Sequence, residues 1–260
     1  MGILNVTPDS FSDGGQFVDV DQAVAHGIQM LDDGAGIIDI GGESTRPGAD
    51  DVSEPDEIAR VVPVIEKIIA LRADAIISID TSKAEVARKS IVAGAVIIND
   101  VTGLKGDPEM FAAAAELNAG VVIMHMKGTP RTMQSEPHYD DVVLEVREFF
   151  HAQLKSAQIA GISDSAIVFD LGIGFGKTSE HNLELLRKLK TLSVADRPLL
   201  LGVSRKSFIG KLIDSEKVAD RNWPTVALTS YAREQGIRLH RVHEVKPNIE
   251  ALRMTEAILG

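Results

Sequence analysis

The chain has 260 residues, of which 44% are hydrophobic and 25% charged, and its formal net charge at pH 7 is −11. This length suits one α/β barrel of about 250 residues, and the hydrophobic fraction argues against a disordered protein. The acidic balance argues against nucleic acid or a membrane surface as a partner, so we expect neither. The absence of cysteine excludes disulfides, thiolate zinc sites and cysteine nucleophiles.

Nothing in the sequence is typical of a membrane or secreted protein. No apolar stretch reaches the roughly 18–20 residues of a membrane helix, and no basic and apolar segments of a secretory signal open the chain. Together with the lack of cysteine, this predicts a cytoplasmic protein. The first apolar run begins at residue 1, so we also expect a preceding N-terminal segment to be missing.

Eight short apolar runs, rich in β-branched residues, alternate with longer amphipathic segments. Each run is too short for a helix, and near-continuous hydrophobicity is typical of strands that are buried on both faces. We therefore expect strands over residues 1–4, 37–40, 75–79, 96–98, 121–124, 166–169, 199–203 and 238–242.

Apolar residues at spacings of three and four predict helices between these runs. One such pattern covers residues 20–31 and ends before Gly34, a residue suited to a helix C-terminus. Another covers residues 58–69 after Pro55, and we expect Pro63 to kink this helix or to separate its first turn. Two more helices are expected over residues 140–160 and 247–259.

The alternation of strands and helices predicts a parallel sheet with right-handed crossovers. A closed (β/α)8 TIM barrel and an open, doubly wound sheet both fit this order of elements. The count of eight strands, the length, and the lack of a second composition zone favour the barrel. We therefore expect a single α/β domain that spans residues 1–260.

Polar residues follow the predicted strands throughout the chain. In a parallel barrel the carboxyl ends of the strands open onto one face, where active sites are built. A single Asp, Asn or Ser at such a position is more often a helix cap, but a full set at successive strands favours a common pocket. The set comprises Asn5, Asp39, Glu43, Asp80, Asn99, His125, Asp170, residues 204–207, Arg241 and His243.

The segment DLGIGFGK, at residues 170–177, superficially resembles a phosphate-binding P-loop. That motif requires glycine where this chain has Leu171, and the glycine spacing does not fit a dinucleotide site either. We therefore reject a nucleotide-hydrolysing function. The segment is either a flexible loop or a close backbone approach to a planar ligand beside Phe175.

Two other loops combine turn residues with side chains suited to ligand contact. Residues 41–49 are rich in glycine and place Arg46 before the stiff Pro47. Residues 5–15 carry Phe11, which can cover either its own loop or a ligand at the barrel mouth. An ordinary surface loop remains the alternative for both.

Basic residues cluster after the last two predicted strands. Lys206 follows the seventh, and Arg241 and His243 follow the eighth on one side of the chain. Barrel phosphate sites commonly lie at these two strands, so we expect an anion site here. The alternatives are a surface salt bridge for Arg241 and a core or capping role for His243. The other histidines outside the set above are interpreted as structural or solvated: His26, His138, His151, His181 and His240.

Seven short motifs are spread along the chain: MGILNVTPDSFSDGG, GGESTRPGA, SIDTSK, IIND, MHM, SRKS and RVHEV. Taken together, they resemble dihydropteroate synthases over essentially the whole chain. The family usually has proline at the position of Leu171, which leaves the path of the sixth loop open. Asn222 and Trp223 also look atypical, and the family's usual N-terminal hairpin is absent.

The resemblance implies a transferase of folate biosynthesis. It would condense 6-hydroxymethyl-7,8-dihydropterin pyrophosphate with p-aminobenzoate, releasing pyrophosphate with the help of Mg²⁺, and sulfonamides would compete with p-aminobenzoate. A homodimer is implied as well. Asp13, Lys206, Arg241 and His243 would take part in the chemistry.

The resemblance also divides the site into subsites. The pterin would contact Asp80, Asn99, Met124, Asp170 and Lys206. The pyrophosphate would contact Asn5, Thr45, Arg241 and His243, with Asn5 on the metal. The p-aminobenzoate would contact Phe11, Arg46, Pro47, Phe175 and Ser207.

The residues are compatible with a dissociative, SN1-like displacement. An arylamine is neutral and nucleophilic at pH 7, so the demanding step is the departure of pyrophosphate. Two other functions share a pterin-reading barrel: the methyltransferase domain of a corrinoid enzyme, and a pterin-binding paralogue without catalysis. Release of pyrophosphate separates the three.

Overall fold

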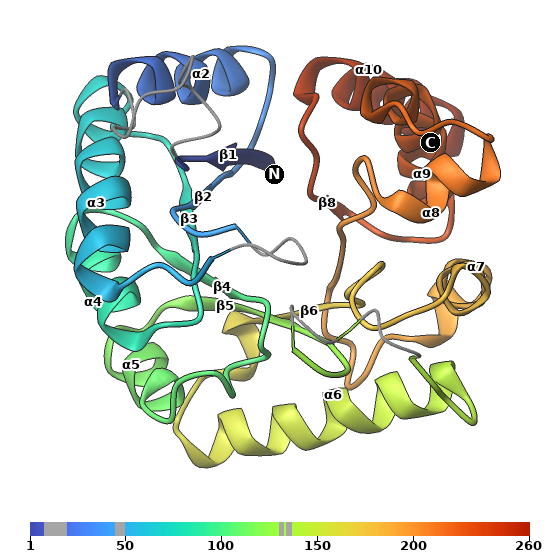
Figure 1. The fold of residues 1–260 in the computed structure, drawn as a ribbon, viewed down its shortest axis with the longest axis horizontal. Helices are drawn as coiled ribbons and strands as arrows, with labels where there is room; N and C mark the ends of the chain where they lie inside the picture. The colour runs from blue at the N-terminus through green and yellow to red at the C-terminus, as the bar shows by residue number, and fades with distance from the viewer. Residues whose placement is uncertain (8–19, 45–49, 130–132, 134–136) are drawn as a thin grey trace.

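The computed structural model describes residues 1–7, 20–44, 50–129, 133 and 137–260. Eight parallel strands form one sheet, in which each strand pairs with the next along the chain (Figure 1). The strands are β1 (Gly2–Asn5), β2 (Ile38–Gly41), β3 (Ile77–Asp80), β4 (Ile97–Asp100), β5 (Gly120–Met124), β6 (Ile167–Asp170), β7 (Leu199–Leu201) and β8 (Leu239–His240).

The two ends of this sheet meet. Gly2 in β1 forms a parallel bridge with Val242, which lies just beyond β8. The Ile3 amide donates to the Val242 carbonyl at 2.9 Å, and the Val242 amide donates to the Met1 carbonyl at 3.0 Å. The consecutive strand order contradicts the doubly wound alternative, in which the order reverses within an open sheet.

Helices surround the curled sheet (Figure 1). The α-helices are α2 (Val20–Asp32), α3 (Glu54–Leu71), α4 (Ala84–Val92), α5 (Met110–Glu116), α6 (Val142–Ile159), α7 (Ser179–Arg187), α8 (Ser207–Leu212), α9 (Asn222–Glu234) and α10 (Val245–Leu259). Short 3-10 turns are η1 (Asp164–Ala166), η2 (Leu189–Thr191) and η3 (Val218–Arg221).

Helix α3 bears on one expectation. We expected Pro63 to kink the helix or to separate its first turn, and α3 is continuous from Glu54 to Leu71, so no first turn is separated. The first turn is held by its own cap, since Ser53 Oγ accepts from the Asp56 amide at 3.3 Å. Buried residues on both sides of Pro63, among them Val61 and Ile65, hold the two halves against the same surface.

Several strands extend one or two residues further along the chain than their apolar runs. Asn5, Asp80 and Asp170 are therefore the last residues of β1, β3 and β6, whereas the sequence placed them after the strands. The ladder of backbone hydrogen bonds continues into the polar residues because inward-facing side chains at a barrel mouth do not need to be apolar. Strand backbone thus fixes the direction of these side chains.

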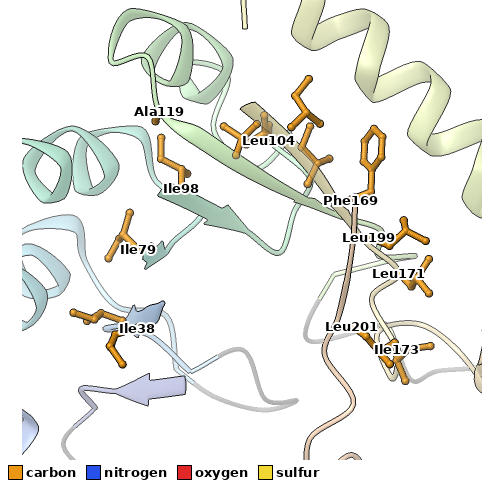
Figure 2. Close-up of a cluster of buried hydrophobic side chains, with 14 of the residues drawn as sticks. Ile38, Ile79, Ile98, Leu104, Ala119, Phe169, Leu171, Ile173, Leu199 and Leu201 are labelled. Carbon is orange, nitrogen blue, oxygen red and sulfur yellow. The ribbon is translucent and has the colours of Figure 1, made fainter. Parts of the chain in front are cut away.

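Side chains alternate between the two faces of the sheet, as strand geometry requires. Residues such as Ile38, Ile79 and Phe169 face outward and pack under the helices in the main hydrophobic core (Figure 2). Leu171 and Ile173 join this core and are fully buried, so packing anchors the start of the sixth loop.

Neighbours of these core residues along the strands face the interior of the curled sheet. Asp39, Ser78, Asn99 and Asp170 are all buried and polar. The interior is therefore lined by hydrogen-bonding groups over several adjacent strands. Among the described residues, no helix is long and apolar enough to cross a membrane.

Candidate active site

A network of charged and polar side chains joins four strand ends inside the sheet. Arg241, just after β8, donates from Nε to Asp39 Oδ2 and from Nη2 to Asp80 Oδ2, both at 2.5 Å. Asn99 donates from Nδ2 to the same oxygen of Asp39 at 3.0 Å. The second oxygen of Asp39, Oδ1, is buried and has no partner among the described residues. One guanidinium group therefore pairs with two carboxylates.

This crowding shifts the ionisation of the network. Burial raises the pKa of Asp80 to about 7; Arg241 opposes the shift, and the Asp39 carboxylate adds to it. The pKa of Arg241 lies above its ordinary value despite burial, because Asp39 and Asp80 favour the charged guanidinium. A network with more carboxylate than cation can accept hydrogen bonds from a ligand whose edge presents N–H groups.

Asp170 stands on the opposite wall, at the end of β6. Its Oδ1 accepts from the Gly172 amide at 2.8 Å. Burial raises the pKa of Asp170, while the charges of Lys206, Arg241 and Lys177 oppose this shift. The carboxyl group is thus buried and surrounded by cations, and only one of its oxygens takes the backbone bond.

Lys206 lies over an aromatic ring. Its Nζ is 3.8 Å from the centroid of the Phe175 ring, in a cation–π contact. Burial lowers the pKa of Lys206 to about 8, and Asp170 opposes this shift. Gly174, at φ +83°, lets the lysine stem pass, because a Cβ there would lie 3.1 Å from its Cδ. The ammonium is therefore placed between Asp170 and an aromatic surface.

The turn before Lys206 is held in an unusual conformation. Arg205 has φ +57°, in the left-handed region that side chains rarely adopt. Its Nε donates to Asn222 Oδ1 at 2.8 Å, its Nη2 pairs with Glu244, and its amide donates to Thr225 Oγ1 at 3.2 Å. Asn222, which looked atypical in the sequence, thus supports the strained turn that presents Lys206.

Met124 and Phe175 form a small apolar surface of their own. They pack with Val101 and Met133 in a cluster that is separate from the main core. Both residues are buried, with Met124 at the end of β5 and Phe175 in the turn after β6. A flat apolar ligand would find a soft, polarizable contact here.

The remaining described candidates lie at the mouth. His243 Nδ1 is 2.9 Å from Ser204 Oγ, which also accepts from the His243 amide at 3.1 Å. Asn5 closes β1 opposite Gly41 in β2. Ser207 is exposed and begins α8. Five candidates lie outside the described residues: Phe11, Asp13, Thr45, Arg46 and Pro47.

Sequence reasoning missed two partners within the site. Asp39 was noted only as a polar residue near a strand end, yet it connects Arg241 with Asn99. Lys177 was considered only in a rejected P-loop, yet it is buried against His125. A charged residue inside a glycine-rich turn was the available signal for Lys177. For Asp39 the signal was a carboxylate in the middle of an apolar strand.

Two of the histidines interpreted as structural are so in the structure. His181 completes the capping box of α7, where its Nδ1 accepts from the Thr178 amide at 3.2 Å. His240 is buried, with Nε2 3.3 Å from the Ile237 carbonyl. Neither role requires a ligand.

The described residues contain no group of three His, Cys, Asp or Glu side chains that could hold a metal ion. Mg²⁺ in enzymes often takes only one or two protein oxygens and completes its shell with water and phosphate oxygens. The amide oxygen of Asn5 is compatible with that donor set.

The chain matches the family of pterin binding enzymes over residues 1–243. The dihydropteroate synthase of Escherichia coli K12 is 48% identical over 263 aligned positions, which cover 100% of this chain and 91% of that protein. The chain belongs to the dihydropteroate synthase family.

Solved structures of the family agree with this assignment. The dihydropteroate synthase of Yersinia pestis in complex with a sulfonamide drug has a TM-score of 0.93 and 46% identity, and the match covers 99% of this chain and 93% of that one. The Xanthomonas albilineans synthase in complex with 7,8-dihydropteroate has a TM-score of 0.90 and 42% identity, with 100% and 92% covered. Both favour the synthase over the methyltransferase alternative.

Proposed function

We propose that the chain is a dihydropteroate synthase, a transferase that joins p-aminobenzoate to 6-hydroxymethyl-7,8-dihydropterin pyrophosphate. A C–N bond forms at the exocyclic methylene, the C–O bond to pyrophosphate breaks, and the arylamine loses a proton. The products are 7,8-dihydropteroate and pyrophosphate. The observation that carries this function is the group of buried and half-buried carboxylate, amide and cationic side chains at the strand ends of a chain of this family.

The pterin edge is proposed to bind the buried acceptors inside the sheet. The carboxyl groups of Asp80 and Asp170 are largely shielded from water. Each therefore gives up few hydrogen bonds to water when it accepts one from a ligand N–H group. Asn99 adds an amide that is already oriented by Asp39. Lys206 would donate to the ring's carbonyl and ring-nitrogen side, and Met124 would pack against the ring face.

The pyrophosphate is proposed to lie where β1, β8 and the second loop meet. Its contacts would be Asn5, Thr45, Arg241 and His243, with Asn5 on Mg²⁺ and Asp13 nearby. When bound, Mg²⁺ supplies charge neutralisation on the leaving group. Arg241 would add positive charge, and His243 would add a hydrogen bond, as the bond to pyrophosphate lengthens.

The p-aminobenzoate is proposed to bind against Phe175, with Lys206 shared between the two substrates. The ring of Phe175 and the ammonium of Lys206 together offer an apolar face and a cation, which suit an aryl carboxylate. The other proposed contacts are Phe11, Arg46, Pro47 and Ser207.

The reaction does not require a strong general base, since an arylamine is neutral at pH 7. We propose a dissociative path in which the electron-rich dihydropterin stabilises positive charge at its methylene. The buried carboxylates Asp80 and Asp170 would favour that charge electrostatically. Asp13, in the first loop, would lie near the same charge.

The order of binding follows from where the subsites lie. Pterin contacts come from strand ends, whereas Phe11, Arg46 and Pro47 belong to glycine-rich loops. We expect a sulfonamide to bind the enzyme tightly only after pyrophosphate and Mg²⁺ are present. Titrating one sulfonamide with and without these ligands tests this order, and equal affinity in both conditions contradicts it.

The finer architecture is part of the proposal. The hydrogen bonds between the two edges of the sheet favour a closed (β/α)8 TIM barrel in a single domain over residues 1–260. We also propose a cytoplasmic homodimer. Sedimentation of the purified chain tests the dimer.

The decisive experiment is turnover. The purified chain is supplied with the pterin pyrophosphate, p-aminobenzoate and Mg²⁺, and both dihydropteroate and pyrophosphate are measured. We expect one pyrophosphate for each dihydropteroate, and no pyrophosphate release above background when p-aminobenzoate is omitted. Pterin binding without turnover would identify a non-catalytic paralogue, and methyl transfer from methyltetrahydrofolate would identify a methyltransferase.

A further inference from the structure

Lys177 is a buried cation that the proposed chemistry does not use. Its side chain lies beneath the turn between β6 and α7, and the residue is only 3% exposed. Its Nζ donates to the Gly172 carbonyl at 3.0 Å and to the Phe175 carbonyl at 3.1 Å. It also lies 3.3 Å from the His125 carbonyl and 2.9 Å from His125 Nδ1. The ammonium thus connects two loops through backbone atoms and one imidazole.

His125 is a suitable acceptor for this ammonium. Burial lowers the pKa of His125 to about 2, and the charge of Lys177 adds to the effect. The imidazole is therefore neutral, and in the tautomer with its proton on Nε2 the free Nδ1 accepts from the Lys177 ammonium. The His125 amide donates to the Asp170 carbonyl at 2.9 Å, so the residue directly continues the pairing of β5 with β6.

The turn between β6 and α7, which lies above Lys177, packs closely against the segment that follows β5. Gly172 and Gly176 have φ of +61° and +63°. A Cβ on Gly172 would lie 1.9 Å from the His125 carbonyl oxygen, and one on Gly176 would lie 2.2 Å from that of Lys127. Backbone therefore packs directly on backbone, and the Lys177 ammonium donates to carbonyl groups of both segments.

The path from Lys177 to the site is short. Lys177 holds the carbonyl of Phe175, and the ring of Phe175 lies 3.8 Å from Lys206 Nζ. The same ring packs with Met124, at the strand end that precedes His125. The hydrogens of Lys177 are directed to these protein acceptors, so the residue does not itself reach the substrates. Burial lowers its pKa to about 7, and Asp170 opposes this shift.

We propose that Lys177 is a positioning residue that ties the β6–α7 turn to the end of β5 and thereby fixes the Phe175 ring beneath the Lys206 ammonium. This inference rests on the proposed function for its kinetic consequence. Its geometric part, the coupling of Lys177 to Lys206 through Phe175, does not depend on that function. Loss of the ammonium lets the Phe175 carbonyl move, and the ring and Lys206 move with it.

The test replaces Lys177 with methionine, which keeps the length of the side chain and removes the donors. Lys190→Met, at an exposed position in η2, is the matched control. Tyr139→Phe is a second control, because it removes the 2.8 Å bond to the Gly176 carbonyl in the same turn without touching Phe175. Circular dichroism and thermal unfolding establish that each variant is folded.

For Lys177→Met we expect the KM for p-aminobenzoate to rise about tenfold, with less than about a threefold change for the pterin pyrophosphate. Both controls should change either KM by less than about threefold. Equal changes in the two KM values, or no change in either, would overturn the positioning role.

A double-mutant cycle distinguishes positioning from general stability. In a Phe175→Leu background, Lys177→Met should add little to the KM for p-aminobenzoate, because the lysine acts through that ring. Independent, multiplicative effects of the two substitutions would contradict the inference. If Lys177→Met does not fold, Lys177→Gln, which retains two donors, replaces it in the same cycle.

A last readout is independent of turnover. The pH dependence of Lys206 acylation, followed by mass spectrometry, gives the apparent pKa of Lys206. In Lys177→Met this pKa should rise toward the ordinary value of lysine, since the repulsion by the Lys177 charge is removed and the burial that lowers the pKa is relaxed. An unchanged pKa in a folded variant would overturn the inference. Absence of turnover in the parent chain would instead refute the proposed function alone.

Discussion

The two sides of the site at the carboxyl ends of the strands are held together in different ways. On the side of β2, β3, β4 and β8, ion pairs and hydrogen bonds join strand ends directly, with Arg241 bound to Asp39 and Asp80. On the side of β5, β6 and β7, the contacts come from turns, with Lys206 over Phe175 and Lys177 beneath it. The first side resists change through charge pairing inside the sheet, whereas the second depends on the packing of loop backbone.

The largest expected effect comes from breaking the charged side. Arg241→Met should reduce the free energy of unfolding at pH 8 by about 3–5 kcal/mol, because it leaves two buried carboxylates without their cation. The loss should be smaller at pH 5, where Asp80, whose pKa is raised to about 7, is protonated. Urea unfolding of parent and variant at both pH values measures this.

An exposed ion pair provides the control for Arg241. Lys67 lies 2.7 Å from Asp21, and their side chains are 52% and 85% exposed. Lys67→Met should change the free energy of unfolding by less than about 1 kcal/mol. If Arg241→Met lowers the free energy of unfolding by no more than Lys67→Met does, the network does not hold the strand ends together.

A smaller effect is expected on the turn side. Phe175→Leu removes the aromatic surface beneath Lys206, so the KM for p-aminobenzoate should rise about tenfold while pterin affinity changes by less than about threefold. Phe111→Leu is the matched control, because Phe111 lies in α5 and packs against the main hydrophobic core. It should leave the KM for p-aminobenzoate and the pterin affinity close to those of the parent. Steady-state kinetics with each substrate varied in turn provides the measurement. Loss of pterin affinity in Phe175→Leu would mean that the two sides are not separable.

The smallest effect concerns the pH dependence of stability. The pKa of Asp80 is raised in the folded state to about 7, so the folded chain binds this proton more tightly than the unfolded chain does. The stabilisation by this proton is therefore gained as the pH falls through 7 toward 4, and lost as the pH rises. Asp80→Asn removes this contribution.

Thermal unfolding between pH 8 and pH 5 tests the sign. The gain in stability on acidification should be smaller in Asp80→Asn by about 1 kcal/mol or more. Asp100, whose pKa burial raises to about 6, is retained in both proteins and cancels in the comparison. An identical pH dependence in the two proteins would show that Asp80 does not titrate in this range.

The sequence predicted the order of strands and helices because both periodicities are local. Residues 20–31 repeat at helical spacing, and the structure has α2 from Val20 to Asp32. Strand ends were less predictable. Apolar content marks the buried part of a strand, whereas the hydrogen-bonded ladder continues to Asn5, Asp80 and Asp170. The polar residues at these ends nevertheless indicated the face on which the candidate site lies.

The contacts within the site were not predictable from one sequence. Asp39 and Arg241 are 202 positions apart and meet only because the sheet curls until its edges join. Lys177 meets His125 only because two turns pack backbone on backbone. Local patterns indicate which residues are polar near strand ends, but the pairing among them depends on strand register and loop path. The family resemblance supplied roles for residues, but not these supporting contacts.

Calorimetric titration of Asp170→Asn tests the separation of the two sides most directly. Asp170 belongs to the pterin edge in this account, and the substitution keeps its size while changing a buried acceptor. The account predicts that affinity for the pterin pyrophosphate falls by at least about 2 kcal/mol, roughly thirtyfold. The asparagine oxygen would keep the bond from the Gly172 amide, so an NH2 donor would face the buried donors of the ligand. Sulfonamide affinity with pyrophosphate and Mg²⁺ present should stay within about threefold of the parent value. Unchanged pterin affinity, or equal losses for both ligands, would contradict the account.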